Sequence, residues 1–243
     1  LSGGLGDDVY LLIGGQNRVT DSAGFDVVKT ESSFTFGYTT DPAVSWGSGP
    51  IEVIELTGSL NTFANGEAGA NTLLGNSGAN TLDGRGGNDI LDGRDGDDVL
   101  KIGSDTGSVG GATNMTGGAG ADTFWTGKGY RGDHSSGANQ LQINDFTSGV
   151  DHIRFGIATT ATAPTTLDTT AVYGGDTLAM VLDRAASGSG SPTAPTISQF
   201  VFGADTYLVL DLSTATTFST GDLAIKLTGT PGVALSDLVF NLV

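Results

Sequence analysis

The arrangement of apolar and polar positions repeats every nine residues along the middle of the chain. From Gly66 to Lys101 the sequence divides without a gap into four blocks, GEAGANTLL, GNSGANTLD, GRGGNDILD and GRDGDDVLK. Every block has glycine at positions one and four, Asn or Asp at position six and leucine at position eight. A six-residue polar turn followed by a short strand with one inward leucine predicts half of a flattened coil. Two blocks therefore complete one coil of a solenoid.

Residues eighteen positions apart should stack on one another in adjacent coils. The repeat places Asn71 next to Asp89 and Asn80 next to Asp98. Turn carbonyls and Asp side chains are expected to line each edge, while the position-eight leucines fill the space between two parallel sheets. These leucines are Leu73, Leu82, Leu91 and Leu100.

The same nine-residue blocks and eighteen-residue spacing occur outside this segment. Near the beginning, GGLGDDVYL at 3–11 is followed by a degenerate block at 12–20 and by DSAGFDVVK at 21–29, so Asp8 and Asp26 are again eighteen apart. One more block, GGAGADTFW, occupies 117–125. We expect 102–116, which contains Asp105, to form a loop between coils. We expect 30–56 to be an insertion, a loop or hairpin, that returns through a strand at 51–56.

After Trp125 the period ends, and a capping region is expected. Ile143-Asn-Asp-Phe146 and the stretch from Gly149 to Phe155 read as two short strands around a turn. Segments 157–171 and 187–196 are expected to be surface loops, and strands are expected at 197–202, 206–211 and 223–227, the first two as a hairpin. One short amphipathic helix is indicated by Leu178, Val181, Leu182 and Ala185, with Asp176 as its N-cap.

Composition adds a chemical preference to this pattern. The 243 residues include 40 glycines and carry a net charge of -17. Of the 27 acidic residues only four are Glu, which leaves 23 Asp. Short carboxylates and glycine turns that let carbonyls point inward suit calcium, which takes six to eight oxygen ligands. This charge excludes nucleic acid as a partner.

Export is the expected setting. The chain has no cysteine and no long apolar stretch for a transmembrane segment, and it begins in the middle of a repeat. We therefore expect a fragment of a longer bacterial protein that is secreted or exposed at the cell surface.

The blocks resemble the repeats-in-toxin (RTX) nonapeptide G-G-x-G-x-D-x-U-x, a calcium-binding parallel β-helix repeat, over 3–29 and 66–125. The resemblance implies several Ca²⁺ ions, held by position-six carboxylates and by backbone carbonyls of the early turn positions. Carried over to this sequence, the ligand positions are Gly3, Leu5, Asp8, Asp21, Ala23, Asp26, Gly66, Asn71, Gly75, Asn80, Gly84, Gly86, Asp89, Gly93, Asp95, Asp98, Gly117, Ala119 and Asp122.

Asn71 and Asn80 depart from the family pattern. A neutral amide is a weaker calcium ligand than a carboxylate. Two interpretations of these coils stay open: they bind calcium, or their Asn side chains stack as ladders without metal.

Two further resemblances concern the C-terminal region. The segment Ile143–Ile153 is similar to the I-x-D-F-x-x-G-x-D-x-I sequence that follows the last RTX coil. The ending from Asp237 to Val243, an acid and then apolar residues, resembles the uncleaved signal read by type I secretion exporters, and QFVFGADTYLVLD at 199–211 resembles RTX surface-layer proteins. An ordinary last strand is the alternative interpretation of the ending.

The sequence lacks the catalytic motifs of two enzyme classes. There is no H-E-x-x-H and no G-x-S-x-G, so zinc-protease and lipase motifs are missing from the sequence. Asp133-His134-Ser135 are neighbours in sequence, which seldom gives triad geometry, and Arg131-Gly132-Asp133 is a triplet expected by chance in such a chain. We expect no enzymatic activity.

The prediction is an all-β protein: a parallel β-roll at 1–125 with an insertion at about 30–56, and a mostly β capping region with one short helix at 126–243. Its expected function is to fold on extracellular calcium and to carry the type I secretion signal. The alternatives are a surface-layer or adhesin component with cell-surface or self-assembly contacts, and the carrier tail of a secreted enzyme whose catalytic domain lies upstream.

Overall fold

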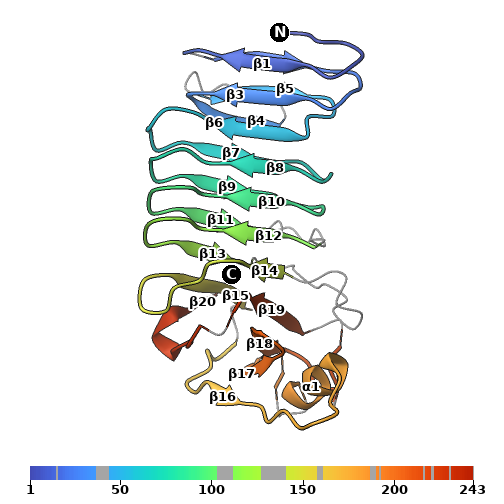
Figure 1. Cartoon of the computed structure of the whole chain (residues 1–243), viewed down its shortest axis with the longest axis vertical. Coiled ribbons are helices and arrows are strands. Elements are labelled where there is room, and N and C mark those ends of the chain that lie inside the picture. Colours follow the sequence, from blue (N-terminus) through green and yellow to red (C-terminus); the bar gives the residue numbers. More distant parts are fainter. Residues whose placement is uncertain are drawn as a thin grey trace.

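The computed structural model is an elongated stack of coils with a wider C-terminal end (Figure 1). The structure describes residues 1–14, 16–36, 44–102, 112–126, 141–157, 161–186, 190–191, 193–215, 217–219, 222–229 and 231–242. The expectations for Asp105 and the 131–135 segment fall outside these residues.

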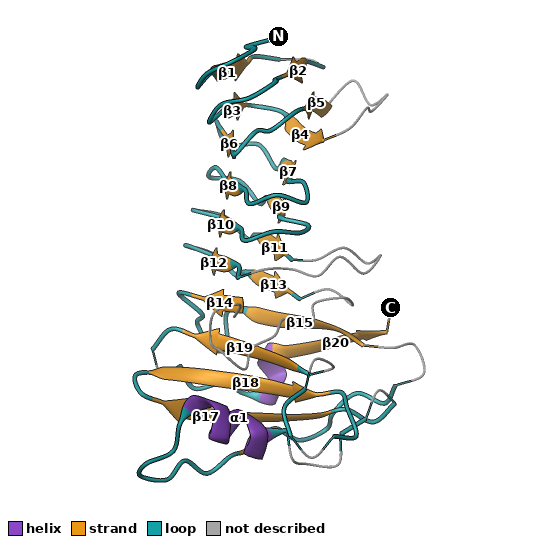
Figure 2. Ribbon diagram, turned by 90° about the vertical axis from the view of Figure 1, so that its right-hand side faces the viewer, coloured by secondary structure: helices purple, strands orange, loops and turns teal. Residues whose placement is uncertain are grey.

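Two sheets run along the stack, one on each side of the coils (Figure 2). Among the described residues, sheet 1 has 11 strands and sheet 2 has nine. Sheet 1 contains, in spatial order, β1 (Val9–Leu12), β3 (Val27–Thr30), β6 (Val53–Leu56), β8 (Thr72–Leu74), β10 (Ile90–Asp92), β12 (Asn114–Thr116), β14 (Leu141–Ile143), β19 (Leu223–Leu227), β18 (Asp205–Asp211), β17 (Thr196–Phe202) and β16 (Asp168–Thr169). Sheet 2 contains β2 (Arg18–Thr20), β5 (Val44–Ser48), β4 (Ser33–Phe36), β7 (Phe63–Asn65), β9 (Thr81–Asp83), β11 (Val99–Lys101), β13 (Thr123–Trp125), β15 (His152–Ile157) and β20 (Leu238–Leu242).

The predicted stacking of residues eighteen apart is confirmed. Ile90 pairs with Thr72 in sheet 1, Val99 pairs with Thr81 in sheet 2, and Val9 pairs with Val27 at the N-terminal end, all in parallel register. Successive blocks alternate between the sheets, so each pair of blocks makes one coil. The degenerate block at 12–20 also contributes a strand, β2.

The core between the sheets is a single column of apolar side chains. The position-eight leucines have no exposed surface, as predicted, and further residues extend the column in both directions. Burial of one such leucine stabilises the fold by roughly 1.5–3 kcal/mol. The column includes Tyr10, Val28, Ile54, Leu73, Leu82, Leu91, Leu100, Met115, Phe124 and Ile153.

The segment predicted as an insertion at 30–56 forms part of the roll. Its described residues supply β4 and β5 to sheet 2 and β6 to sheet 1, the last close to the predicted strand at 51–56. The predicted hairpin is wrong, because β4 and β5 pair in parallel. Strand β5 also pairs with β2, and β4 also pairs with β7. Both strands must run in the direction of these neighbours to continue the parallel ladder. Phe34 is fully buried in the core, which agrees with a packing role.

The loop predicted at 102–116 is too long. Asn114–Thr116 form β12, which pairs with β10, and Met115 enters the core. The apolar Met115 follows two polar residues, which is the pattern of a repeat strand.

The roll continues beyond Trp125 by two coils. Of the two strands predicted between 143 and 155, the second is β15, whereas the first lies earlier than predicted, as β14 at Leu141–Ile143. The two strands lie in opposite sheets and so form one more coil. Strands β19 and β20 then stack on β14 and β15, respectively, in parallel. A 3-10 turn, η1 (Leu235–Asp237), precedes β20. The ending is therefore the last strand of sheet 2.

The chain between β15 and β19 forms the wide end of the molecule (Figure 2). The predicted hairpin is confirmed, since β17 and β18 pair antiparallel and β18 also pairs antiparallel with β19. Helix α1 (Leu178–Ala185) buries Val181, Leu182 and Ala185 against this hairpin. Its N-cap is Thr177, not Asp176 as predicted, because the Thr177 side chain accepts the Met180 N–H. Asp176 instead pairs with Arg184 on the helix.

Candidate metal centre

The position-six residues form a hydrogen-bonded ladder along each edge of the roll. In several of them the backbone N–H donates to the side-chain Oδ1 of the counterpart in the next coil. Asn71 donates to Asp89 at 2.9 Å, Asn80 to Asp98 at 2.7 Å, and Asp98 to Asp122 at 2.8 Å. These side chains are almost fully buried, with about 1% exposure at Asp89, Asp98 and Asp122. The ladder hydrogen bonds engage Oδ1 of each carboxylate, and Oδ2 takes no part in them.

The remaining carboxylate oxygens have few protein partners. Within the described residues, Asp26 Oδ2 and Asp98 Oδ2 are buried without any hydrogen-bond partner. Burial raises the pKa of Asp89 and of Asp98 to about 7, and that of Asp122 to about 6. A buried carboxylate with a bare oxygen is costly unless a proton or a cation neutralises it.

The position-one glycines leave space for these oxygens. A Cβ atom added at Gly84 would lie 2.5 Å from Asp89 Oδ2, and one at Gly93 or Gly117 would collide with the carboxylate of Asp98 or Asp122. A Cβ at Gly93 would also lie 2.5 Å from the carbonyl oxygen of Gly117 in the next coil. A carboxylate oxygen and a backbone carbonyl from adjacent coils therefore meet beside the same bare glycine.

A family model for the RTX calcium-binding nonapeptide repeat, in four copies, matches residues 65–100 and 109–130. These residues therefore carry RTX-type calcium-binding repeats. A comparison with curated proteins found no match. The coil at 3–29 lies outside the matched RTX residues although it has the same stacking.

The RTX coils that carry Asp fit calcium. The fit rests on the orphaned Asp98 Oδ2 and on the Gly117 carbonyl beside it, because calcium prefers carboxylate and carbonyl oxygens. Asp89 and Asp122 present the same oxygen over Gly84 and Gly117. Calcium at these turns would supply the positive charge that the buried carboxylates lack.

The RTX coils that carry Asn are satisfied without metal. Asn71 Oδ1 accepts the Glu67 N–H at 2.8 Å, and its Nδ2 donates to the Ile51 carbonyl at 2.9 Å. Asn80 Oδ1 accepts the Asn76 N–H at 2.7 Å, and its Nδ2 donates to Asn76 Oδ1 at 3.1 Å. The ladder interpretation of these two coils therefore accounts for their amide atoms. Gly66 and Gly75 keep the same space free for the Asn side chains.

The backbone of the turn differs between the two kinds of coil. In the Asp coils at 84 and 93, position two is a left-handed arginine, Arg85 (φ 62°) or Arg94 (φ 72°), and position four is a left-handed glycine, Gly87 (φ 120°) or Gly96 (φ 112°). The block at 117 has glycine at both positions with positive φ. Among the described residues, neither of the Asn coils at 66 and 75 has a positive φ at these positions.

This difference redirects one backbone donor. In the Asp coils the N–H of Arg85 or Arg94 turns away and donates to Asp83 or Asp92, each at 3.1 Å. In the Asn coils the position-two N–H points at the position-six side chain instead. The left-handed turn thus keeps a donor away from the carboxylate, which leaves its second oxygen for a cation.

The predicted position-three carbonyls are partly used by the fold. Leu5 bridges Ala23, and Asp95 bridges Ala119, between adjacent coils. The carbonyls of Ala23 and Ala119 accept the N–H groups of Gly6 at 2.9 Å and Gly96 at 2.8 Å. The Gly86 N–H donates to the Glu67 carbonyl. A carbonyl has two lone pairs, so one remains on each for a ligand.

Sequence reasoning missed two members of the ladders, Glu52 and Asp151. The Asp26 N–H donates to Glu52 Oε2 at 2.7 Å, and the Asp122 N–H donates to Asp151 Oδ1 at 2.9 Å. A signal for both was present, since Glu52-x-Ile54 and Asp151-x-Ile153 have the spacing of positions six and eight. The longer connections before them concealed that spacing.

Proposed function

We propose that this RTX chain is a calcium-gated folding module: it stays unfolded where calcium is scarce and folds into the roll outside the cell. The observation that supports the proposal most directly is Asp98 Oδ2, which is buried beside the Gly117 carbonyl and has no protein partner. RTX repeat proteins are typically secreted, which agrees with an extracellular setting.

The energetics favour calcium-dependent folding over calcium binding to a roll that is already stable. The chain carries a net charge of -17, and its core is a single narrow column, so the calcium-free roll combines self-repulsion with limited apolar burial. At ten times its dissociation constant, a calcium ion contributes only about 1.4 kcal/mol per site. Several sites must act together, and because each coil packs on its neighbours, folding is expected to be cooperative in calcium.

A calcium titration of the purified chain followed by circular dichroism tests this function. We expect a steep gain of β signal at submillimolar to millimolar calcium, and none with magnesium at the same concentrations. A chain that is fully folded in chelator would contradict gating and leave a constitutive β-solenoid.

The matched variant is Asp98→Asn, compared with Asp168→Asn. Asp98 lies in the ladder, whereas Asp168 is an exposed residue of β16. The first substitution should shift the calcium midpoint to higher concentration and flatten the transition, and the second should leave both unchanged. Equal behaviour of the two variants would show that total charge, not the ladder, controls folding.

Export through a type I secretion exporter is the second part of the proposal, with the C-terminal segment as its signal. In the folded chain this segment is strand β20, and Asp237 is buried, accepting hydrogen bonds from Ser148 Oγ at 2.6 Å and from Gly149 N–H at 3.1 Å. The signal would therefore be read before folding. Truncation after Asp237 should abolish export by a reconstituted exporter, whereas Asp237→Asn should mainly weaken the folded cap.

A surface-layer or adhesin role is the alternative function. The 199–211 run forms most of the β17–β18 hairpin at the wide end of the molecule, where Val201 is 48% exposed. Calcium-dependent assembly of the purified chain in sedimentation velocity would support this role. A monomer at every calcium concentration would favour the secretion module.

We propose no catalytic role for these residues. In the part of the chain that the structure describes, no helix is long and apolar enough to cross a membrane. The remaining alternative, the carrier tail of a secreted enzyme, predicts that the purified chain lacks hydrolase activity on protein and lipid substrates.

A further inference from the structure

Two buried aspartates meet in the capping region, at the wide end of the molecule (Figure 2). Asp211 is the last residue of β18, and Asp222 directly precedes β19. Their exposed fractions are 1% and 0%, and their side chains are hydrogen-bonded to each other. Because β19 pairs with both β18 and β14, the two aspartates lie where the chain returns from the hairpin to the roll.

A hydrogen bond between two carboxyl groups requires a proton, because two ionised carboxylates are both acceptors. In the described part of the chain, no Lys, Arg or His side chain forms an ion pair with either aspartate. Two ionised carboxylates in contact in a buried site repel each other, so one of them keeps its proton. The pair therefore fits the fold with a single negative charge.

The surrounding hydrogen-bond donors indicate which aspartate carries that charge. Asp222 accepts hydrogen bonds from four described donors, which are Leu212 N–H at 2.9 Å, Ser219 N–H at 2.8 Å, Ser219 Oγ at 3.0 Å and Ser213 Oγ at 3.3 Å. Within the same part of the chain, Asp211 accepts two longer bonds, from Ser213 N–H at 3.1 Å and Gly190 N–H at 3.3 Å. Hydrogen bonds to the ionised form favour it, so Asp222 is the carboxylate and Asp211 is the acid that donates to it.

The elements packed around the pair supply no cation to it among their described residues. Arg184 of α1 and Lys226 of β19 each pair with a different aspartate. Thr196 of β17, which is uncharged, lies opposite Asp211. Asp183 of α1 is exposed and accepts a backbone N–H at 3.1 Å from the connection between β18 and β19. A proton is therefore the neutralising charge that the described residues leave to the pair.

From this geometry we propose that Asp211 and Asp222 share one proton and form a pH-dependent lock on the capping region. The singly charged pair holds together the end of β18, the start of β19 and the segment at Gly190. This contact is close, because a Cβ atom added at Gly190 would lie 2.4 Å from Asp211 Cγ. When both carboxyl groups ionise, their repulsion separates these segments and loosens β19 from its neighbours.

Rising pH should therefore weaken the capping region. Burial and the adjacent charge of Asp222 raise the pKa of Asp211 from 3.8 to about 6. Because this pKa is raised in the folded chain, the stabilising contribution is fully present below about pH 4 and is lost as pH rises through about 6. Calcium sites respond in the opposite direction, because calcium needs deprotonated ligands. In saturating calcium, the capping region and the calcium coils should thus respond to pH with opposite signs.

Amide hydrogen exchange of the calcium-loaded chain, followed by mass spectrometry, tests the proposal. After correction for the intrinsic pH dependence of exchange, the protection of β18 and β19 should fall about tenfold between pH 5 and pH 7, and that of β10 should not fall. Unchanged protection of β18 and β19 would overturn the proposal. Protection that rises with pH would also overturn it, because a cation would then join the two carboxylates. Calcium is present throughout, so the result does not depend on whether calcium gates folding.

Asp211→Asn should keep the high protection at pH 7 and remove the pH dependence, because its amide can accept the Ser213 N–H and donate to Asp222 as the protonated acid does. Asp222→Asn should lower protection at both pH values, since an amide nitrogen cannot accept the bonds from Ser219. Asp183→Asn is the matched control, an exposed acid beside the same connection, and should behave like the parent chain. Equal responses of Asp211→Asn and Asp183→Asn would overturn the lock.

A carbon-13 titration of the carboxyl groups tests the shared proton in the parent chain, without relying on the folding of a variant. In saturating calcium, the Asp211 carboxyl should titrate at about pH 6, and this transition should be absent from Asp211→Asn. An Asp211 carboxyl that titrates in the usual range of aspartate would overturn the proposal.

Discussion

The coils that carry Asn71 and Asn80 and the coils that carry Asp89, Asp98 and Asp122 share a period and a buried apolar column, but their turns are built differently. In the Asn turns, the backbone of position two donates to the side chain, and both ends of each amide are hydrogen-bonded. In the Asp turns, a left-handed residue at position two directs that donor elsewhere. The first kind is complete in protein alone, and the second is complete only with a cation or a proton.

This difference indicates how the roll divides its tasks. The Asn coils lie in the middle of the stack, between the Asp-bearing N-terminal coil and the Asp coils that follow. They provide a hydrogen-bonded platform that needs no metal, and the Asp coils on either side make folding responsive to calcium. A solenoid whose stability depends on contacts between neighbours can propagate from such a platform.

Converting an Asn turn into an Asp turn should have the largest effect. Asn80→Asp removes an amide donor and places a carboxylate beside Asn76 Oδ1 and the Gly93 carbonyl. The uncompensated buried charge should cost about 3–5 kcal/mol of unfolding free energy. Urea denaturation in chelator, with a stabilising osmolyte that keeps the parent chain folded, measures this loss. Asn88→Asp, at an exposed position of the neighbouring turn, is the control, and an equal cost there would remove the distinction between turns.

A pH series should separate the calcium-free and calcium-loaded states next. Burial raises the pKa of Asp89 and Asp98 to about 7 and of Asp122 to about 6, above the unfolded value of 3.8. Raised folded-state pKa values mean that the stabilising contribution of these groups is fully present below about pH 4 and is lost as pH rises to about 7, so the calcium-free roll should weaken from about pH 4 to about pH 7. Calcium needs deprotonated ligands, so its stabilising effect should grow over the same range.

Thermal melting with and without calcium measures how stability changes with pH in each state. The two series should therefore diverge as pH rises. The variant Asp89→Asn with Asp98→Asn should flatten both, because Asn does not titrate. Parallel slopes in chelator and calcium would contradict the assignment of these carboxylates as ligands.

Converting an Asp turn into an Asn turn should have opposite effects in the two conditions. Asp89→Asn neutralises a buried carboxylate, so it should maintain or raise stability in chelator. In calcium at ten times the dissociation constant it should remove about 1.4 kcal/mol, the contribution of one site. Chemical denaturation in both buffers, with a stabilising osmolyte that keeps the calcium-free chain folded, tests this crossing. A loss of the same size in chelator would mean that Asp89 acts through packing alone.

The smallest effect concerns the backbone of the turns. Arg85 has φ 62°, which glycine adopts without strain, so Arg85→Gly should stabilise the chain by up to about 1 kcal/mol. Glu67, at the same position of an Asn coil, has no positive φ, so Glu67→Gly should cost about 0.5–1 kcal/mol. Differential scanning calorimetry can resolve this change of sign. Two effects of the same sign would indicate that the two turns share one conformation.

Much of the roll could be predicted because its signals are local and periodic. Leucine at position eight and glycine at positions one and four define a half-coil, and a spacing of eighteen then determines which residues stack. The hairpin at 197–211 was equally accessible, because its turn residues separate two apolar runs. The N-cap of α1 was wrong by one residue, since Thr177 and Asp176 both suit that position and only packing of Arg184 distinguishes them.

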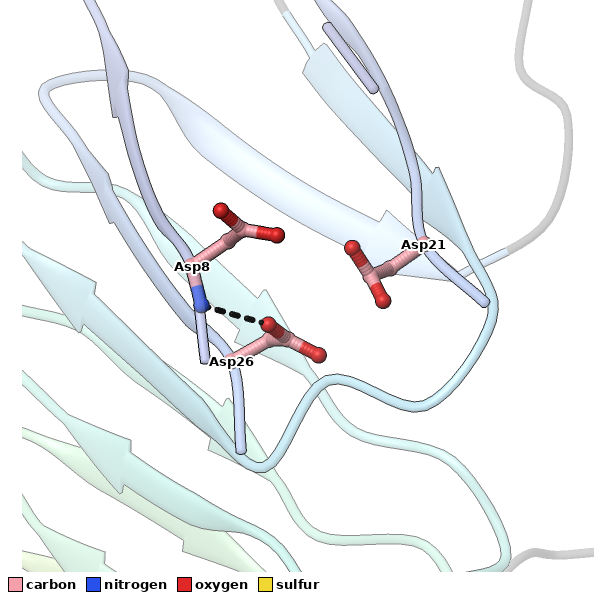
Figure 3. A group of neighbouring side chains, drawn as sticks. All are labelled: Asp8, Asp21 and Asp26. Carbon is pink, nitrogen blue, oxygen red and sulfur yellow. Dashed lines mark hydrogen bonds between the residues drawn. The ribbon is translucent and has the colours of Figure 1, made fainter. Parts of the chain in front are cut away.

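By itself the sequence determined the repeat, the buried column and the oxygen-rich turns, since each depends on residues close together in the chain. Only the tertiary structure decided which oxygens remain bare. Glu52 and Asp151 reach the ladders across spacings of 26 and 29 residues, and Asp8 meets Asp21 and Asp26 because the coils that carry them stack on one another (Figure 3). The physical reason is that a cation site consists of oxygens from different coils, and the direction of each oxygen depends on turn conformation and stacking, which no single repeat specifies.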